Sequence, residues 1–361
     1  MKKTSPGPAS RLTRRQVLLA AKRYYDLGHT QADIAADLGV SPSYVARLMK
    51  QAKDSGWVRI FIDTDRELDL AAQIMERYTN LRHVEVVPTG ATPADTALSV
   101  ATAMASWFND LIERDEENDE PKIKNVAIGG AWTHRLMVEQ VISRKNRISV
   151  GPTTLTPFRG KVARWTASTV ATQLAERLGA LTADDLPSSE NGRRGYFYNL
   201  TVDPPAQPLD SLRNWYAALS ERSDYQLMLD FWRHADIVLL SVAGLEFSYG
   251  DVAKRLELLD TSIEDMKSKG AKAVLANQFI DSLGQLVPLA DGVPGYEPTF
   301  PIELLKDSSS SDQASHRLVV LDARGSSVIC VVPHIASITH LFLDDASATL
   351  LLSAHTDTTR L

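Results

Sequence analysis

The most restrictive feature of this sequence is a series of three helix-like segments, separated by glycines, near the amino terminus. Residues 13–27, 31–38 and 41–55 each have the apolar spacing of a short helix. The first two segments end at Gly28 and Gly39, where glycine can take a positive φ and stop a helix. The sequence therefore predicts three short helices in succession.

The turn between the second and third segments has the spacing of a helix-turn-helix. Ala35 is small where the second helix must approach the third, Gly39 lies at the turn, and Val45 closes the core between the helices. Thr30 and Ser41 are suited to cap these two helices. In such a unit the third helix enters the major groove of DNA.

Several polar residues of this unit are candidates for contacts with double-stranded DNA. We expect Arg47 to bind a guanine edge, with a solvated helix face as the alternative interpretation. Thr30 and Gln31 begin the second helix and are expected to hold backbone phosphates. The outward positions of the third helix complete the predicted DNA-binding set, which is Thr30, Gln31, Ser41, Ser43, Tyr44, Arg47 and Lys50.

The charge distribution divides the chain at about the same place. Residues 1–62 hold 11 Lys and Arg against 4 Asp and Glu, a net charge of +7, although the whole chain carries −6. A basic unit can bind a polyanion, whereas the acidic remainder would be repelled by it. A surface that merely keeps the chain soluble is the alternative. We therefore predict a DNA-binding domain at 1–62 and a second domain at 63–361.

The remaining sequence alternates between strand and helix patterns. Residues 83–90 read as a strand, 91–112 as a helix, and 124–142 as a strand, a glycine-containing loop and a helix. This order is typical of an α/β domain with a mainly parallel sheet. Two polar runs, 113–122 and 307–316, are expected to be surface loops.

Other classes of protein are disfavoured by what the sequence lacks. It has no apolar run long enough to span a membrane, and the single cysteine, Cys330, lies in a predicted buried strand. We therefore expect a cytoplasmic protein without membrane contact. The eight histidines are scattered, and no P-loop or dinucleotide fingerprint occurs. No metal site or cofactor is predicted.

Over nearly its whole length the chain resembles the SorC-type (SorC/DeoR sugar-binding) bacterial transcriptional regulators. The segments that carry the resemblance are RYYDLGHTQADIAADLGVSPSYVARLMKQAKDSGWVRI, NVAIGGAWTHRL, SVGPTTLTPFRG, TASTVATQLAERLGA, ADIVLLSVAGLE, AVLANQFIDSLGQLV and THLFLDDASATLLL. The resemblance implies a helix-turn-helix domain and a larger α/β effector domain related in fold to phosphosugar isomerases and glucosamine-phosphate deaminase. It also implies operator DNA as a partner, a sugar or sugar-phosphate effector, and assembly into a homodimer or homotetramer.

Candidate effector-binding residues lie where predicted strands pass into helices. Such loops offer N–H groups to an anion, and ligands of open α/β sheets bind beyond the carboxyl ends of the strands. Each residue also fits an ordinary turn. The candidates are Gly129, Gly130, Thr133, Thr153, Thr154, Ser241, Gly244, Gly325 and Ser326.

Two departures from the family pattern leave the phosphorylation of the effector open. The second loop reads Pro152, Thr153 and Thr154 where relatives carry a glycine pair, and LDARGSSVICVV lacks a matching lysine. A phosphate site without its lysine loses a point charge. Arg324, or Arg159 with Lys161, is a possible substitute. An unphosphorylated polyol, a different small anion and a degenerate pocket therefore remain alternatives.

The competing hypothesis is an enzyme, similar to a phosphosugar isomerase or deaminase, that carries a DNA-binding module. Such chemistry needs a carboxylate or histidine within hydrogen-bond reach of the substrate. His134, beside the first loop, is the histidine of interest, and a partly exposed position in the first turn of a helix is its simpler interpretation. The available carboxylates, of which the last two are expected to cap the final helix, are Asp236, Asp281, Asp322, Asp344 and Asp345.

Overall fold

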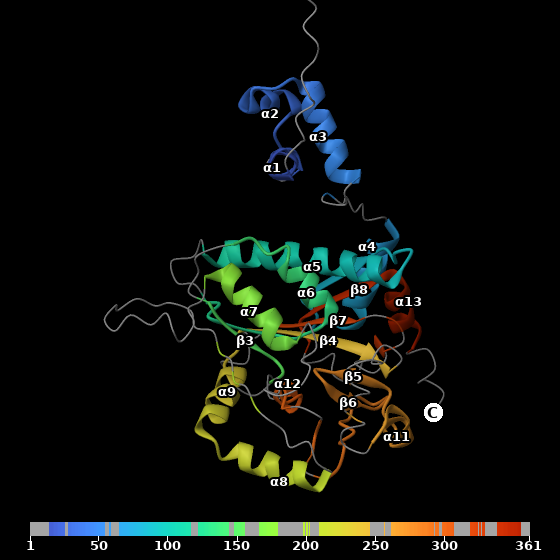
Figure 1. The fold of residues 1–361 in the computed structure, drawn as a ribbon. Coiled ribbons are helices and arrows are strands. Elements are labelled where there is room, and N and C mark those ends of the chain that lie inside the picture. Colours follow the sequence, from blue (N-terminus) through green and yellow to red (C-terminus); the bar gives the residue numbers. More distant parts are fainter. Residues whose placement is uncertain are drawn as a thin grey trace, which may run out of the picture. The chain divides into compact units, whose positions relative to one another are not determined.

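A computed structural model shows two compact units, Met1–Ile62 and Asp63–Leu361 (Figure 1). The structure describes residues 14–25, 28–54, 58, 65–116, 122–143, 148–155, 166–179, 198, 200, 202, 209–245, 256, 261–291, 293–295, 298–306, 318–323, 325, 327, 328 and 338–354. Five residues named above lie outside these ranges, as does the polar run 307–316: Arg159, Lys161, Arg324, Ser326 and Cys330.

The first unit contains the three predicted helices, α1 (Arg14–Tyr25), α2 (Gln31–Leu38) and α3 (Pro42–Asp54). Gly39 has a φ of 64°, so the turn between α2 and α3 uses the left-handed conformation that glycine favours. The small core of the unit is shared by all three helices and includes Val17, Ile34, Ala35, Val45 and Leu48. The predicted helix-turn-helix is confirmed.

The second unit is an α/β domain. Its described helices and strands, in chain order, are α4 (Asp65–Arg77), β1 (His83–Val87), α5 (Pro93–Glu116), β2 (Asn125–Ile128), α6 (Trp132–Val138), β3 (Ser149–Pro152), α7 (Ala167–Leu178), α8 (Leu209–Ser220), α9 (Ser223–Arg233), β4 (Ile237–Gly244), α11 (Ile263–Ser268), β5 (Ala273–Leu275), β6 (Gln278–Ile280), α12 (Glu303–Lys306), β7 (Leu318–Ala323), β8 (His340–Asp344) and α13 (Asp345–Ser353).

The central sheet is parallel, in the order β1-β8-β7-β4-β2-β3. A short hairpin of β5 and β6 joins it by antiparallel pairing to β4. The expected mainly parallel sheet is therefore confirmed.

Helices cover both faces of this sheet, so its strands are buried on both sides. Alternate residues of a strand face opposite sides. In β4, Ile237 and Leu239 pack in the core that contains α5, α6 and α7, which lie on one side of the sheet in Figure 1. Val238 and Leu240 pack in the core that contains α4, α9 and α13. The continuous apolar runs of β4 and β7 follow from this double coverage.

The connections diverge at the carboxyl ends of β2 and β4. From β2 the chain continues to β3, on one side, and from β4 it runs through the β5–β6 hairpin to β7, on the other. A reversal of this kind opens a crevice in doubly wound sheets, and ligands bind there. Within the described ranges, no helix is long and apolar enough to cross a membrane.

Candidate functional site

The outward surface of α3 carries most of the predicted DNA-binding side chains. Ser41, Ser43, Arg47 and Lys50 are exposed, and Tyr44 is half-buried against the small core. The guanidinium carbon of Arg47 lies 5.3 Å from the centre of the Tyr44 ring, in the range of a cation–π contact. Tyr44 therefore supports the Arg47 side chain at the surface.

The start of α2 is held by a reciprocal capping box. The Thr30 Oγ1 atom accepts a hydrogen bond from the Asp33 backbone at 3.2 Å, and the Asp33 carboxylate accepts one from the Thr30 backbone at 3.0 Å. The Thr30 hydroxyl also donates to Asp33 at 2.6 Å. Both polar groups of Thr30 thus serve the helix start, which leaves half-buried Gln31 as the more available of the two predicted phosphate contacts.

Gly129 and Gly130 follow β2 at the reversal of the sheet connections. A Cβ on Gly129 would lie 3.0 Å from His134 Nδ1 and 3.4 Å from the Thr153 hydroxyl. A Cβ on Gly130 would lie 2.5 Å from the Ala167 backbone nitrogen, closer than real Cβ atoms come. The two glycines therefore let this loop pass between α6, the end of β3 and the start of α7.

Three side chains from α6, β4 and β7 form a polar cluster beneath the loop. His134 Nε2 lies 3.1 Å from Asp322 Oδ1, and both side chains are fully buried. The two atoms are close, but they are not aligned as in a hydrogen bond. The Ser241 hydroxyl donates to the other Asp322 oxygen at 3.2 Å.

Two of the predictions for this cluster are wrong. His134 lies in the first turn of α6, as expected, but its side chain is buried and not partly exposed, because it turns inward toward Asp322. Ser241 and Gly244 do not form a loop, because β4 pairs with β7 as far as Val242 and with β5 as far as Gly244. Asp322 was one of five carboxylates without a distinguishing signal in the sequence.

Buried polar atoms without a hydrogen-bond partner among the described residues also gather here. They are the Thr133 hydroxyl and the ring nitrogens of His134, and the side chains of both residues are fully excluded from solvent. Buried polar groups are ordinarily satisfied, so unpaired ones suggest a place for a bound molecule or water. Together with Asp322, these residues provide a hydroxyl, an imidazole and a carboxylate. Groups of these kinds form hydrogen bonds with the hydroxyls of a ligand.

The loop after β3 carries a second group of hydroxyls. Thr153 and Thr154 are buried, and Thr299 donates to the Thr153 carbonyl at 2.9 Å and lies 3.2 Å from the Thr154 hydroxyl. The Asn277 amide, in the turn between β5 and β6, donates to Thr154 at 3.3 Å. The sequence analysis did not identify Thr299 or Asn277, since neither follows a strand of the parallel sheet.

The predicted residue after β7 lies in a different setting. The Gly325 backbone donates to the hydroxyl of Ser347, in the first turn of α13, at 2.7 Å. Gly325 is thereby bound to the start of α13, and no described contact joins it to His134 or Thr153.

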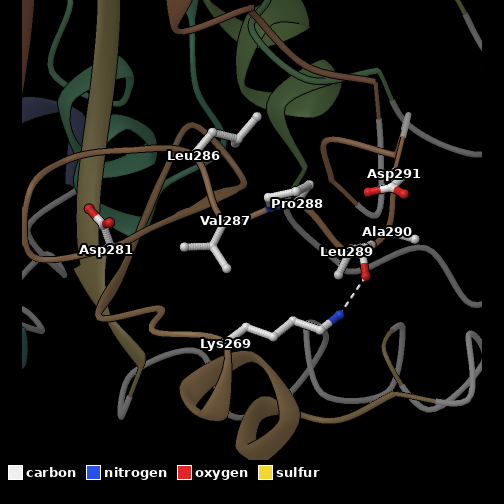
Figure 2. A pocket seen from close by; sticks show the side chains of 8 residues that line it. All are labelled: Lys269, Asp281, Leu286, Val287, Pro288, Leu289, Ala290 and Asp291. Carbon is white, nitrogen blue, oxygen red and sulfur yellow. Dashed lines mark hydrogen bonds between the residues drawn. The ribbon is translucent and has the colours of Figure 1, made fainter.

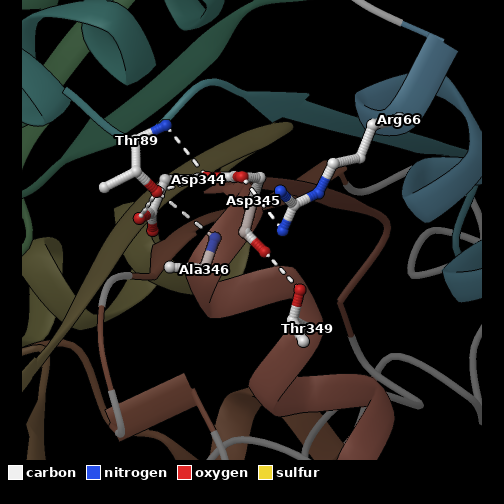
Figure 3. Close-up of polar contacts among 6 residues, drawn as sticks. All are labelled: Arg66, Thr89, Asp344, Asp345, Ala346 and Thr349. Atoms are coloured by element: carbon white, nitrogen blue, oxygen red, sulfur yellow. Dashed lines mark hydrogen bonds and ion pairs between the residues drawn. The ribbon is translucent and has the colours of Figure 1, made fainter.

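An acidic turn marks the neighbouring end of β8 (Figure 3). The Thr89 hydroxyl donates to Asp344 at 2.7 Å, the Thr89 backbone donates to Asp345 at 3.0 Å, and Arg66 lies 3.3 Å from Asp345. Although burial opposes its ionisation, the hydrogen bonds from Thr89 and the charge of Arg66 hold the pKa of Asp345 below its usual value. Asp344 occupies the cap position of α13 but accepts from the Ser347 hydroxyl instead of making the usual backbone cap bond.

Two surface pockets belong to the same domain. Figure 2 shows one of about 380 Å³ beside α11, where Lys269 Nζ donates to the Leu289 carbonyl at 2.6 Å. The other, of about 390 Å³, is lined in part by Arg213, Glu303 and Thr299. Because Thr299 bonds to Thr153, this second pocket borders the loop after β3.

Among the described residues, no three His, Cys, Asp or Glu side chains gather as metal ligands would.

Comparison with known sequences identifies the amino-terminal unit. Residues 8–56 match the family model described as a Homeodomain-like domain. Over 108 residues the chain is 32% identical to the uncharacterized transcriptional regulator YjhU of Escherichia coli (strain K12). This match covers 28% of the present chain and 33% of YjhU, so it spans about a third of that relative.

Comparison with solved structures covers almost the entire chain. The full-length sorbitol operon regulator SorC from Klebsiella pneumoniae matches 94% of this chain and 99% of its own, with a TM-score of 0.56 and 18% identity. A DeoR family transcriptional regulator from Listeria monocytogenes matches 80% of this chain and 100% of its own, with a TM-score of 0.59 and 13% identity. The resemblance indicated by the sequence is thus confirmed in the fold: this chain has the architecture of the SorC and DeoR regulators, a helix-turn-helix joined to a parallel α/β domain.

Proposed function

We propose that this chain is a cytoplasmic transcriptional regulator of carbohydrate metabolism genes that is controlled by a sugar or sugar phosphate. Residues 1–62 bind operator DNA, and residues 63–361 bind the effector and assemble the homo-oligomer. The observation that carries the proposal is the presence, in one chain, of a helix-turn-helix with exposed Arg47 and Lys50 and of a polar cluster at the reversal point of a parallel sheet. The architecture shared with SorC, a sorbitol operon regulator, supports it.

The surface of α3 is suited to base readout. Arg47 presents a planar set of donors that fits the O6 and N7 atoms of guanine, and Lys50 can neutralise a phosphate or contact a base. A single unit of this size reads few bases, so a symmetric oligomer with two units is needed for a specific operator. The half-sites are then expected about 34 Å apart, or a multiple of it.

The α/β domain would act as the sensor. Because Thr133, His134 and Asp322 are fully buried, a ligand that contacts them must open the domain to enter. Such a ligand binds the open arrangement of the domain more tightly than the closed one. An effector shifts a conformational equilibrium only if its affinities for the two arrangements differ. A coupling of about 1–3 kcal/mol would change operator affinity about 5- to 150-fold.

The experiment that tests this function uses the full-length chain. Duplexes enriched from a random pool by binding to the chain would be titrated in a gel-shift assay, with and without a panel of sugars and sugar phosphates. We expect one enriched sequence with two related half-sites, and at least one compound that changes its affinity. Equal binding to every duplex, together with indifference to every compound, contradicts the proposal.

The buried pair of His134 and Asp322 also favours a second candidate, an isomerase- or deaminase-like enzyme. A histidine oriented by a carboxylate is a common general base. The same panel of compounds would be incubated with the chain and analysed for products. Conversion of a sugar phosphate that is lost in His134→Gln favours the enzyme, whereas binding without conversion favours the sensor.

A further inference from the structure

A pocket of about 390 Å³ lies on the part of the α/β domain that contains α8, α9 and the β5–β6 hairpin. Its lining comes from α8, the start of α9, β6 and the residues between β6 and α12. It includes none of the residues at the reversal point of the sheet, which are Thr133, His134, Ser241 and Asp322. A volume of this size is typical of small-molecule sites. The pocket is therefore a second candidate site with its own chemistry.

Aromatic and proline rings form much of the wall of this pocket. They belong to Tyr216, Tyr225, Pro294, Pro298 and Pro301. The Tyr216 hydroxyl donates to the Gly295 carbonyl at 3.0 Å, which holds this ring beside the segment that carries the prolines. Rings of this kind present flat apolar faces, and an aromatic ring packs well against such faces. The wall therefore favours a ligand with a planar apolar part.

Two buried side chains of the wall have polar atoms available for a ligand. Gln278 is 2% exposed, and its Nε2 atom donates to the Phe300 carbonyl at 2.8 Å, so that Oε1 is the free acceptor of the amide. Tyr225 is 9% exposed, and burial raises the pKa of its hydroxyl, which therefore keeps its proton. Neither Gln278 Oε1 nor the Tyr225 hydroxyl has a hydrogen-bond partner among the described residues. Because buried polar groups are ordinarily paired, a ligand in this pocket is expected to bring a donor to Gln278.

The pocket also has one exposed cation and one exposed carboxylate, Arg213 and Glu303. Arg213 Nε donates to the Asp291 carbonyl at 2.8 Å, which positions the guanidinium and leaves its two terminal nitrogens for a ligand. Within the part of the chain that the structure describes, no salt bridge joins Arg213 or Glu303 to another side chain. A guanidinium and a carboxylate at one pocket complement a ligand that carries both a carboxylate and an ammonium group.

We propose that this pocket binds a free aromatic amino acid whose side chain carries an N–H or O–H donor, that is, tryptophan or tyrosine. The carboxylate of the ligand pairs with Arg213 and its ammonium group with Glu303, on the exposed side of the pocket. The aromatic ring lies against the tyrosine and proline rings, and its donor reaches Gln278 Oε1 on the buried side. This site is separate from the proposed sugar sensor and does not depend on it.

The test uses calorimetry on the full-length chain with probes that differ in a single group. L-tryptophan and L-tyrosine are each compared with the corresponding amine, which lacks the carboxylate, and with the N-acetyl derivative, which lacks the ammonium group. The analogues that lack the ring donor are 1-methyl-L-tryptophan and L-phenylalanine. We expect at least one of the two amino acids to bind, and each of its analogues to bind about tenfold more weakly, which corresponds to about 1.4 kcal/mol.

Variants at exposed positions connect each group of the ligand with its partner and leave the interior of the domain intact. Arg213→Gln should abolish the preference for the amino acid over its amine, because the amine has no carboxylate. Glu303→Gln should likewise abolish the preference over the N-acetyl derivative. Arg222→Gln is the matched control, since Arg222 is exposed, pairs with Asp224 and does not line the pocket. It should change none of these affinities.

Three results would overturn the proposal. One is that neither L-tryptophan nor L-tyrosine binds to the chain. Another is that Arg213→Gln retains the full preference for the amino acid over its amine, as Arg222→Gln does. The third is that an analogue without the ring donor binds as tightly as its parent, which would remove Gln278 from the contact. Each of these results leaves the proposed regulator intact, because neither a sugar nor an operator enters the measurement.

Discussion

His134 and Asp322 are brought together by α6 and β7, with 3.1 Å between Nε2 of the histidine and Oδ1 of the aspartate, and neither side chain reaches solvent. A carboxylate in this position needs its partners, because an uncompensated charge in the interior is strongly destabilising. The same two residues therefore contribute to the stability of this edge of the sheet and belong to the candidate site.

Removal of the carboxylate should therefore be costly. We expect Asp322→Ala to lower the free energy of unfolding by about 3–5 kcal/mol, because it leaves His134 and Ser241 buried without their partner. Asp322→Asn keeps the shape and an acceptor, and its loss should be smaller. Urea unfolding of the full chain, followed by a probe of the α/β domain, measures both. Equal losses for the two variants would show that the retained shape and acceptor contribute nothing, and an unchanged stability of Asp322→Asn would show that the charge is not needed.

The sequence was sufficient to predict the helix-turn-helix, because its determinants are local. Gly39 must take a positive φ at a fixed spacing from Ala35 in the sequence. Thr30 and Ser41 must lie at the positions that precede the first turns of α2 and α3. The mainly parallel sheet was predictable for a similar reason, since the order of strand and helix patterns already favours it.

The polar cluster was not predictable, because its contacts depend on strand order. His134 reaches Asp322 only because β4 lies between β2 and β7, and this order is not encoded near either residue. Asp322 also stands in an apolar run, where a carboxylate has no local signal. Ser241 was expected in a loop, but β4 extends through it to Gly244.

Gly129→Ala should impair the effector response and leave DNA affinity unchanged. The added Cβ would lie 3.0 Å from His134 Nδ1, so the imidazole must shift away from the site. The double variant Gly129→Ala with His134→Ala removes the clash and gives the matched control. Thermal unfolding of the four chains forms a double-mutant cycle. We expect the double variant to be more stable than the sum of the single effects indicates, and strict additivity would contradict the contact.

Arg47→Ala should weaken specific operator binding by about 1–3 kcal/mol and relax the preference at one base pair. The reason is the exposed position of Arg47 on α3, supported by the ring of Tyr44. Lys53→Ala is a control from the last turn of the same helix, where the ammonium lies 5.6 Å from the centre of the Tyr25 ring. Gel-shift titrations on operator variants measure the effect. If Arg47→Ala retains full discrimination at every position, Arg47 does not read bases.

Thr89→Val should destabilise the junction of β1, β8 and α13 by about 1–2 kcal/mol, since Thr89 donates to both Asp344 and Asp345. The pKa of Asp345 is lower in the folded chain than in the unfolded chain. Its contribution to the free energy of unfolding is therefore complete above the pKa of the unfolded chain, and it is lost as the pH falls through the pKa of the folded chain. The effect of Thr89→Val should therefore shrink in acid. Thr349→Val is the matched control for urea unfolding at each pH, because the Thr349 hydroxyl donates to the Asp345 carbonyl and to no other group of the described residues. An effect independent of pH would contradict the assignment to ionised Asp345.

His340 should make the stability of the α/β domain depend on pH in a different window. Burial, followed by the charges of His83 and Arg82, lowers the pKa of His340 from 6.5 to about 4, and its ring lies against Trp107. Between pH 6.5 and 4 the unfolded chain binds a proton that the folded chain does not, so stability is complete above pH 6.5 and falls toward pH 4, by about 3 kcal/mol at most.

The variant His340→Phe keeps a ring in contact with Trp107 and removes the titration. Its free energy of unfolding, measured in urea from pH 7.5 to 4, should fall less steeply than that of the natural chain between pH 6.5 and 4, while the two slopes should agree above pH 7. His234→Gln, at an exposed histidine, should reproduce the natural profile. Parallel curves for the natural chain and His340→Phe would mean that His340 is as easily protonated in the folded domain as in the unfolded chain, and the low pKa would be wrong.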